Sequence, residues 1–309
     1  MNEYRASVKL MGSAFGLVVS HENEREAHEL LDEGIREIQR IEDLLSEFRS
    51  GSITTRINEQ AGIREVPVDD EVYSLVERCL RISALTQGAF DISVKPLKAL
   101  YNFKNGSFRF PSKEIIRETI KNIGFGKIVL NPERKSVFLS QINMAISFAS
   151  LGKGYAADRV KQKWIERGVT SGVINASGDL TTIGVRADGS PWKVGIAHPD
   201  KKEEMMFFLP VSDASIATSG DYEQYFIREG TRYSHVINPK TGLPVKGIKS
   251  VSMISVSTEL SDALATAVFV MGIDNGLYLV NQLPGTHCLI INDKNQTFYS
   301  KNLELAYAS

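Results

Sequence analysis

The sequence predicts an α+β fold, with mixed sheets flanked by helices. Of its 309 residues, 42% are hydrophobic and 24% are charged, which is typical of a globular enzyme and enough for one large or two modest domains. Helical and strand patterns follow each other in an irregular order, which argues against a doubly wound sheet. Because the chain shows no linker or internal repeat, we expect a single domain over residues 1–309, or two closely packed lobes with a cleft between them.

The charge balance argues against two classes of partner. The 36 lysines and arginines nearly cancel the 37 aspartates and glutamates, so no overall basic field is available to hold nucleic acid or an anionic membrane. No apolar run reaches the ~18–20 residues of a membrane span, and residues 1–5 lack the apolar stretch of a signal peptide. As written, the chain is expected to be cytoplasmic unless a leader was removed. Cys79 and Cys288 fit no metal or redox spacing, so we expect two core thiols.

The first half of the chain predicts a hairpin, three helices and a second hairpin. Two β-like runs are separated by Met11-Gly12, which indicates the first turn. Apolar residues then recur at steps of three and four, which marks a long amphipathic helix. The elements expected here are strands at 6–10 and 14–19, helices at 22–48, 70–86 and 113–123, and strands at 127–130 and 136–139.

The second half is richer in strands. Its first helix is closed by Gly168, and a later helix ends before Gly272, at the C′ position where a left-handed residue is needed. The elements expected here are strands at 144–151, 172–174, 192–197, 205–211, 215–217, 233–237 and 251–256, helices at 155–167 and 258–271 followed by one more helix, and a terminal hairpin of 288–291 with 296–299.

The run Gly152-Lys-Gly-Tyr-Ala-Ala157 fits the dinucleotide fingerprint GxGxxG/A. A Rossmann site also needs an acidic residue about 20 positions further on, where this chain has Val173-Ile-Asn175. A Rossmann site, and the NAD-dependent oxidoreductase that it would indicate, are therefore disfavoured. A glycine-rich helix start still presents N–H groups to an anion, with Lys153 adding positive charge. The structural alternative is that the glycines serve only a tight turn.

Asp262 and Thr266 lie four residues apart on a predicted helix, so their side chains share one face. Two hard oxygen ligands, completed by carbonyls and waters, suit Mg²⁺ and not zinc or copper. Asp262 also lies near the start of that helix, where the helix dipole favours an anion. Spacing alone therefore leaves two interpretations, a magnesium site or simple capping.

His235 is the histidine with the most informative context. It lies on a predicted strand that runs into the turn Asn238-Pro-Lys-Thr-Gly242, a common way to place a side chain at the rim of a site. The alternative is a hydrogen-bonded structural histidine. No nucleophile elbow and no histidine pair with zinc spacing are present.

Taken in order, these signals resemble the ApbE-type FAD:protein FMN transferases over nearly the whole chain. The motifs that carry the resemblance are Met11-Gly12, residues 46–58, Gly88-Ala-Phe-Asp91 with Pro96-Leu97, Gly152–Asp158, Asn175–Asp179, Ala217–Tyr222, Tyr233-Ser-His235 with Pro239–Gly242, and Asp262–Thr266. The resemblance implies an α+β enzyme that binds FAD without a Rossmann fold. It further implies Mg²⁺-dependent transfer of FMN from FAD to a threonine or serine hydroxyl of a partner protein, with AMP released.

The resemblance also assigns roles to residues. Asp262 and Thr266 become side-chain ligands of Mg²⁺, with backbone oxygens from Ala265 and the Ser150 region. We hypothesise in addition that His235, or a carboxylate near the metal, takes the proton of the incoming hydroxyl, which makes His235 and Asp262 the candidate catalytic residues. The residues implied to contact the flavin nucleotide are Met11, Phe48, Ala89, Phe90, Asp91, Ser147, Lys153, Val236 and Ile237.

Two positions depart from the family pattern. Ser147-Phe-Ala-Ser150 replaces a run that carries an aspartate in many members, and Phe48 replaces a tyrosine. The loss of one carboxylate affects the adenosine-side contacts, while the Asp262 and Thr266 pair is intact. The departure at Ser147 would favour a flavin-binding protein without turnover. An FAD pyrophosphatase, in which water replaces the threonine, is a second alternative, which the sequence does not separate from the transferase.

The resemblance implies a partner and leaves the compartment open. The acceptor would be a redox flavoprotein subunit with a short Gly-Ala-Thr-like motif. Because many relatives are exported, a removed signal peptide would make this chain periplasmic or a membrane-anchored lipoprotein.

Overall fold

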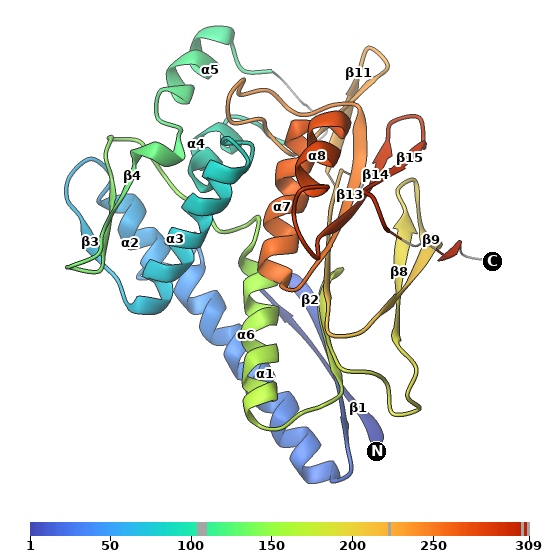
Figure 1. Ribbon diagram of the computed structural model, residues 1–309. Helices are drawn as coiled ribbons and strands as arrows, with labels where there is room; N and C mark the ends of the chain where they lie inside the picture. The colour runs from blue at the N-terminus through green and yellow to red at the C-terminus, as the bar shows by residue number, and fades with distance from the viewer. Residues whose placement is uncertain (104–109, 222–223, 304–305, 308–309) are drawn as a thin grey trace.

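The structure, a computed structural model, describes residues 1–103, 110–221, 224–303 and 306–307. An eight-stranded antiparallel sheet forms its centre (Figure 1). Across this sheet the strands run in the order β1 (Asn2–Leu10), β2 (Ser13–His21), β6 (Gly172–Ala176), β7 (Asp179–Ile183), β10 (Ser215–Gly220), β13 (Ile248–Ser255), β14 (His287–Asn292) and β15 (Thr297–Tyr299). The α+β prediction is confirmed.

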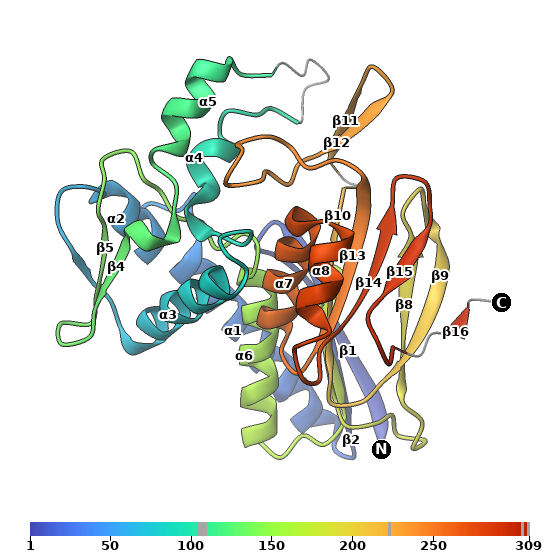
Figure 2. The same ribbon diagram turned by 45° about the horizontal axis from the view of Figure 1, so that its top comes forward.

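Helices cover one face of this sheet and a small sheet covers the other (Figure 2). The helices are α1 (Glu24–Leu45), α6 (Gly152–Glu166), α7 (Thr258–Met271) and α8 (Ile273–Val280). The small sheet consists of β8 (Trp192–His198), β9 (Lys201–Val211) and β16 (Ala306–Tyr307). Its buried side chains, such as Ile196 and Phe207, pack in one cluster with Ile216 and Leu289 of the central sheet. The middle strands β7, β13 and β14 are therefore buried on both faces, whereas the edge strand β1 stays partly exposed.

A second lobe lies beside the helical layer (Figures 1 and 2). It consists of α2 (Ile53–Glu59), β3 (Val66–Pro67), α3 (Asp70–Leu85), a 3-10 turn η1 (Ile92–Val94), α4 (Lys95–Lys98), α5 (Lys113–Ile120), a second 3-10 turn η2 (Phe125–Lys127), β4 (Ile128–Asn131) and β5 (Ser136–Leu139). One hydrophobic core joins this lobe to the rest, since Val76 and Val137 share a cluster with Leu17 and Phe269. A separate hairpin, β11 (Tyr225–Arg228) with β12 (Thr231–Ser234), projects near the junction.

Most elements follow the sequence periodicity. The first hairpin, the long helix α1, both later hairpins and the helix that ends at Gly272 lie where they were predicted. Gly272 has a positive φ of +85°, as predicted, but it is the C-cap residue and not C′, and its ψ of 175° differs from the left-handed helical conformation. Cys79 and Cys288 are free and fully buried, which confirms two core thiols. Within the described residues, no helix is both long and apolar enough to cross a membrane.

The predicted strand at 144–151 is wrong. Ile146 pairs with the Asn58 side chain, which accepts from its N–H at 2.7 Å and donates to its carbonyl at 3.0 Å. The Ser147 N–H donates to the Ile92 carbonyl at 2.9 Å. The segment is apolar because it is buried, and the backbone groups of Ile146 and Ser147 bond to the Asn58 side chain and to η1 instead of a neighbouring strand.

Three further expectations need correction. Helix α6 begins at Gly152, three residues earlier than predicted, so its glycines lie within the helix and not in a preceding turn. Strand β12 ends at Ser234, so residues 235–237 follow the strand instead of belonging to it. The small polar residues of the Asn175–Asp179 motif predict a loop between two strands, but the run is mostly strand, with a tight turn at Ser177 and Gly178. The short elements α2, β7 and β11 were not predicted, because few residues provide too little periodicity.

Candidate active site

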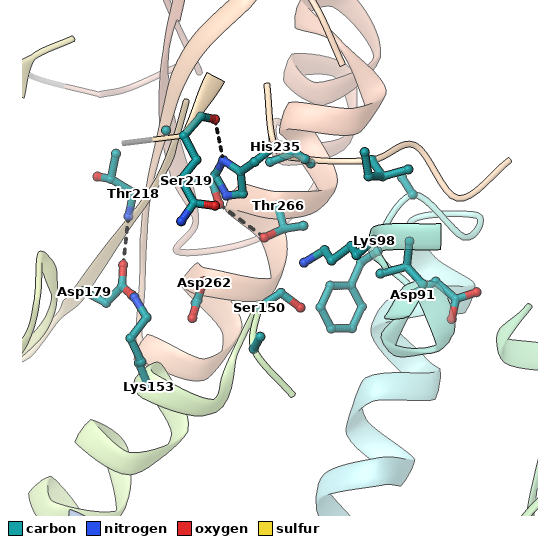
Figure 3. A pocket seen from close by; sticks show the side chains of 18 of the residues that line it. Asp91, Lys98, Ser150, Lys153, Asp179, Thr218, Ser219, His235, Asp262 and Thr266 are labelled. Carbon is teal, nitrogen blue, oxygen red and sulfur yellow. Dashed lines mark hydrogen bonds and ion pairs between the residues drawn. The ribbon is translucent and has the colours of Figure 1, made fainter. Parts of the chain in front are cut away.

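A cavity of about 260 Å³ lies where the two lobes meet the central sheet (Figure 3). One wall is formed by the β6–β7 turn, the end of β10 and helices α6 and α7, and the other by η1, α4 and the loop after β12. The described residues that line it are Ser13, Ala89, Phe90, Asp91, Val94, Lys98, Ala149, Ser150, Lys153, Ser177, Asp179, Thr218, Ser219, Gly220, Gln224, His235, Val236, Ile237, Pro239, Asp262 and Thr266. Segments that are distant in the sequence therefore line one cavity, and the surface of this cavity is mainly polar.

Helix α7 holds Asp262 in the cavity wall, and other residues cap this helix. The Ser257 hydroxyl accepts from the Leu260 N–H at 3.1 Å. The Asp158 carboxylate on α6 accepts from the Thr258 and Glu259 N–H groups at 2.9 and 2.8 Å. Because these two side chains satisfy the orphan donors of the helix start, the capping interpretation of Asp262 is wrong.

The Asp262 carboxyl is buried beside charged groups. Burial raises its pKa, and the neighbouring Asp179 carboxylate raises it further. Lys153, Lys98 and the Gly154 N–H act in the opposite direction. Oδ2 is inaccessible to water and accepts no hydrogen bond within the described part of the chain. A buried carboxylate oxygen without a donor is costly, unless a cation binds there.

Thr266 lies one helical turn after Asp262, on the same side of α7 (Figure 3). Its hydroxyl is 3.2 Å from the Ser219 hydroxyl at the end of β10. Ser150, just before α6, lines the same space. These are hard oxygen donors around an unsatisfied carboxylate, so the residues present fit Mg²⁺. No group of three or more His, Cys, Asp or Glu side chains suited to a metal is found among the described residues, so substrate and water oxygens would complete the coordination.

Lys153 and Asp179 form an ion pair on the same wall. Lys153 Nζ lies 2.6 Å from Asp179 Oδ2, while Asp179 Oδ1 accepts from the Thr218 N–H at 3.2 Å. The pair links α6 to the β6–β7 and β10 strand ends.

Gly154 has a different function, because a Cβ there would lie 2.6 Å from the Thr258 carbonyl oxygen. Its lack of a side chain allows α6 to approach the start of α7 closely, and a Rossmann-type role is not needed to explain it.

The opposite wall depends on Asp91. Asp91 Oδ1 accepts from the N–H and hydroxyl of Ser93 at 2.8 and 2.6 Å, and Oδ2 accepts from the Phe125 N–H at 2.8 Å. Burial raises the pKa of this carboxyl, although the hydrogen bonds from Ser93 and Phe125 act to lower it. Figure 3 shows the carboxylate directed away from the cavity centre. Asp91 therefore fixes the start of η1, while Ala89 and Phe90 before it line the cavity.

His235 lies at the cavity rim directly after β12. Its Nδ1 is 3.2 Å from the Gln224 carbonyl oxygen, which also accepts from the His235 N–H at 3.1 Å. Because a carbonyl only accepts, Nδ1 carries the proton, and we assign the free lone pair to Nε2. Burial, with the positive charge of Lys98, lowers the pKa of His235 to about 4. The imidazole is therefore neutral at physiological pH, and Val236 and Ile237 continue the same wall.

Four residues proposed from the resemblance do not line this cavity. Phe48 is 88% exposed, Ala265 is fully buried within α7, and Ser147 is buried in the loop before α6. Met11 lies in the β1–β2 turn, where its N–H donates to Glu42 Oε1 at 2.8 Å.

The sequence did not identify Lys98, Ser13 or Gln224 as site residues, although they line the cavity. None of them lies in a motif, and only the folding of α4, the β1–β2 turn and the β10–β11 connection brings them together. Tyr222, the last residue of the Ala217–Tyr222 motif, lies outside the described residues.

Comparison with known proteins yields a consistent set of relatives. A profile of the ApbE family matches residues 11–290. The chain is 29% identical to the FAD:protein FMN transferase of Treponema pallidum, over 94% of this chain and 85% of that protein. It is 28% identical to the FAD:protein FMN transferase of Escherichia coli, over 85% and 77% respectively.

Two solved structures support the same grouping. The ApbE protein of Thermotoga maritima superposes with a TM-score of 0.88 at 29% identity, covering 97% of both chains. The apo flavinyl transferase ApbE of Pseudomonas stutzeri superposes with a TM-score of 0.86 at 28% identity, covering 97% of this chain and 95% of that one. The similarity therefore extends over both lobes and the cavity between them.

Proposed function

This chain belongs to the ApbE family, and from that membership we propose that it is an FAD:protein FMN transferase. The relatives named above carry this activity in their names. We propose further that it uses Mg²⁺, that it transfers FMN to a threonine or serine hydroxyl of an acceptor protein, and that it releases AMP. The observation that carries this proposal is the buried Asp262 Oδ2, which has no described hydrogen-bond donor and lies in a wall of hydroxyl and charged groups.

Asp262 and Thr266 would hold the Mg²⁺ through their side chains, with a backbone oxygen of the Ser150 region. The resemblance adds the backbone oxygen of Ala265, whose side chain does not line the cavity. When bound, Mg²⁺ supplies positive charge to the phosphate oxygens while the phosphorus is attacked. Lys153 lies on the same side of the cavity, in an ion pair with Asp179. The ligands of Mg²⁺ would come from α7 and from the loop before α6, while Ser219 at the end of β10 lies beside the Thr266 hydroxyl.

His235 is suited to remove the proton from the acceptor hydroxyl. Its neutral imidazole presents the Nε2 lone pair, because Nδ1–H is directed to the Gln224 carbonyl. The acceptor oxygen forms a bond to the FMN phosphorus, and its proton passes to Nε2. The bond between this phosphorus and the oxygen bridging to AMP breaks, and AMP leaves with that electron pair.

The test is to incubate the protein with FAD, Mg²⁺ and a peptide that contains a Gly-Ala-Thr motif, and to follow the peptide by mass spectrometry. We expect the peptide mass to increase by that of one covalently bound FMN. One AMP should be released into solution for each modified peptide. The control peptide replaces the threonine by alanine and stays unmodified. Free FMN with AMP and no adduct would instead indicate an FAD pyrophosphatase, and bound FAD with neither product would indicate a flavin-binding protein.

A further inference from the structure

Lys98 is a cationic side chain at the centre of the cavity that no sequence motif indicated. Figure 3 shows its ammonium directed toward the space between Thr266, Asp262 and Ser150. Of the two lysines among the described lining residues, Lys153 is paired with Asp179. Lys98 forms no ion pair with any residue that the structure describes. Its charge is therefore available to a ligand.

The main chain at Lys98 is firmly held. Helix α4 follows η1, whose start is fixed by the Asp91 carboxylate. Leu97 is fully buried in a cluster with Val94, Tyr101, Ile123 and Ile237. The Tyr101 hydroxyl then donates to the Gly242 carbonyl at 2.5 Å, which ties α4 to the loop after His235. Because the main chain is anchored, binding a ligand at Lys98 does not require ordering of α4.

The other lysine of α4 provides a comparison within the same helix. Lys95 Nζ lies 3.4 Å from Glu47 Oε2, and Lys95 does not line the cavity. Lys98 lies three residues later. Burial lowers the pKa of its ammonium, although the negative charges of Glu47 and Asp262 act to raise it. A half-buried ammonium without an adjacent carboxylate is unfavourable in the empty site and becomes favourable when an anion occupies the cavity.

We propose that the Lys98 ammonium binds the diphosphate of the dinucleotide substrate, facing the Asp262 and Thr266 oxygens across the cavity. This inference rests on the proposed function, which places a diphosphate in the cavity. Lys98 lines the same cavity as Asp262, Thr266 and His235, and its ammonium points toward the Asp262 and Thr266 side. A positive charge at this place offsets the negative charge that builds up on the departing AMP phosphate. Lys98 is thus a substrate-binding residue of the reaction.

The experiment measures binding of FAD and of riboflavin, which has no phosphate, to wild-type protein and to Lys98→Met, Lys98→Arg and Lys95→Met in buffer with Mg²⁺. Flavin fluorescence gives both affinities. We expect Lys98→Met to weaken FAD binding by about tenfold or more, the range of a lost charged hydrogen bond. Riboflavin binding should change by less than about twofold. Lys98→Arg should recover most of the FAD affinity, and Lys95→Met should behave as the wild type.

Two results would overturn the proposal. Equal weakening of FAD and riboflavin would show that Lys98 supports the cavity without contacting phosphate, and unchanged FAD binding in Lys98→Met would show that the charge is not used. Thermal melts of each variant exclude unfolding as the cause. If the proposed function is wrong, the wild-type protein will produce neither AMP nor a peptide adduct. The comparison of FAD with riboflavin binding needs no turnover, so it tests Lys98 separately.

Discussion

At the residue scale, the burial of single polar groups separates functional from structural side chains. Asp91 and Asp262 are both buried carboxylates in the same cavity lining. Both oxygens of Asp91 have protein donors, whereas Asp262 Oδ2 has none among the described residues. A carboxylate whose hydrogen bonds are complete stabilises the fold, and one that lacks a partner is available to a ligand.

Replacing Asp262 by alanine tests the proposed cation site. We expect FMN transfer to the acceptor peptide to be lost while the far-UV circular dichroism is unchanged. Addition of Mg²⁺ should raise the melting temperature of the wild type but not of Asp262→Ala, because only a folded site binds the ion. Asp274→Ala, on the exposed first turn of α8, serves as the control. Normal turnover in Asp262→Ala would contradict the proposal that Asp262 is a ligand of Mg²⁺.

His235 makes stability depend on pH. Its pKa is about 4 in the folded protein and about 6.5 when unfolded. Between these values the unfolded chain binds more protons, so stability rises with pH. The free energy of unfolding should fall by up to about 3 kcal/mol as the pH decreases from 6.5 to 4.

The matching measurement is urea unfolding of His235→Gln and wild type between pH 7.5 and 5. We expect the variant to lose less stability than the wild type over this range. His28→Gln, at an exposed histidine of α1, should retain the wild-type pH dependence. Parallel curves for wild type and His235→Gln would contradict the assigned neutral imidazole.

At the element scale, the contact between α6 and α7 positions the catalytic wall. Asp158 of α6 accepts hydrogen bonds from the Thr258 and Glu259 N–H groups and from the Ser257 hydroxyl. The run Gly152–Asp158 therefore has two functions. Its start presents Lys153 to the cavity, and its end caps the helix that carries Asp262.

Asp158→Ala removes this cap. We expect a decrease in the free energy of unfolding of about 1–3 kcal/mol, because three donors at a partly buried helix start lose their acceptor. Urea titration measures the change, with Glu166→Ala at an exposed position of the same helix as the control. If Asp158→Ala were as stable as Glu166→Ala, the capping role would be wrong.

Gly154→Ala tests the second part of the same contact. The added Cβ would meet the Thr258 carbonyl oxygen at 2.6 Å, a backbone atom that cannot rotate away. We expect a loss of about 1–3 kcal/mol in stability. Gly126→Ala, where nothing lies within 4 Å of the new Cβ, should change stability by less than about 0.5 kcal/mol. Weakened FAD binding at full stability would instead favour an anion-binding function for this glycine.

At the scale of the whole molecule, charged residues join the separate sheets. Arg232 of β12 donates to Asp221, after β10, at 2.5 Å and to Asp200, between β8 and β9, at 3.2 Å. Lys249 of β13 also contacts Asp200 at 2.5 Å. Burial raises the pKa of Asp221 to about 6, although Arg232 opposes the shift. Local clusters such as this one coexist with a net charge of −1, so overall charge does not reveal where anions bind.

The two lobes share one hydrophobic core, and we propose that the chain unfolds as one domain. Leu17 of the central sheet, Ile41 of α1, Val76 of α3 and Val137 of β5 belong to a single cluster. We expect one calorimetric transition, with van't Hoff and calorimetric enthalpies in agreement. Two resolved transitions, with the second lobe melting separately, would contradict a single cooperative unit.

The sequence alone determined the secondary structure of the long elements and the identity of much of the site. Periodic apolar residues located α1 and α7, because one face of each must be buried. The spacing of Asp262 and Thr266 placed both on one side of a helix, because local geometry fixes that relation. The order of several motifs indicated the family.

Only the tertiary structure decided between the interpretations that local spacing left open. Residues 144–151 were apolar for burial and not for strand pairing, because their hydrogen bonds go to the distant residues Asn58 and Ile92. Asp262 is not a cap, because Asp158, on another helix, satisfies the donors. Lys98 reaches the cavity only because Leu97 and Tyr101 anchor α4 beside the His235 loop. Such contacts join residues that are far apart in the chain, and no local pattern contains them.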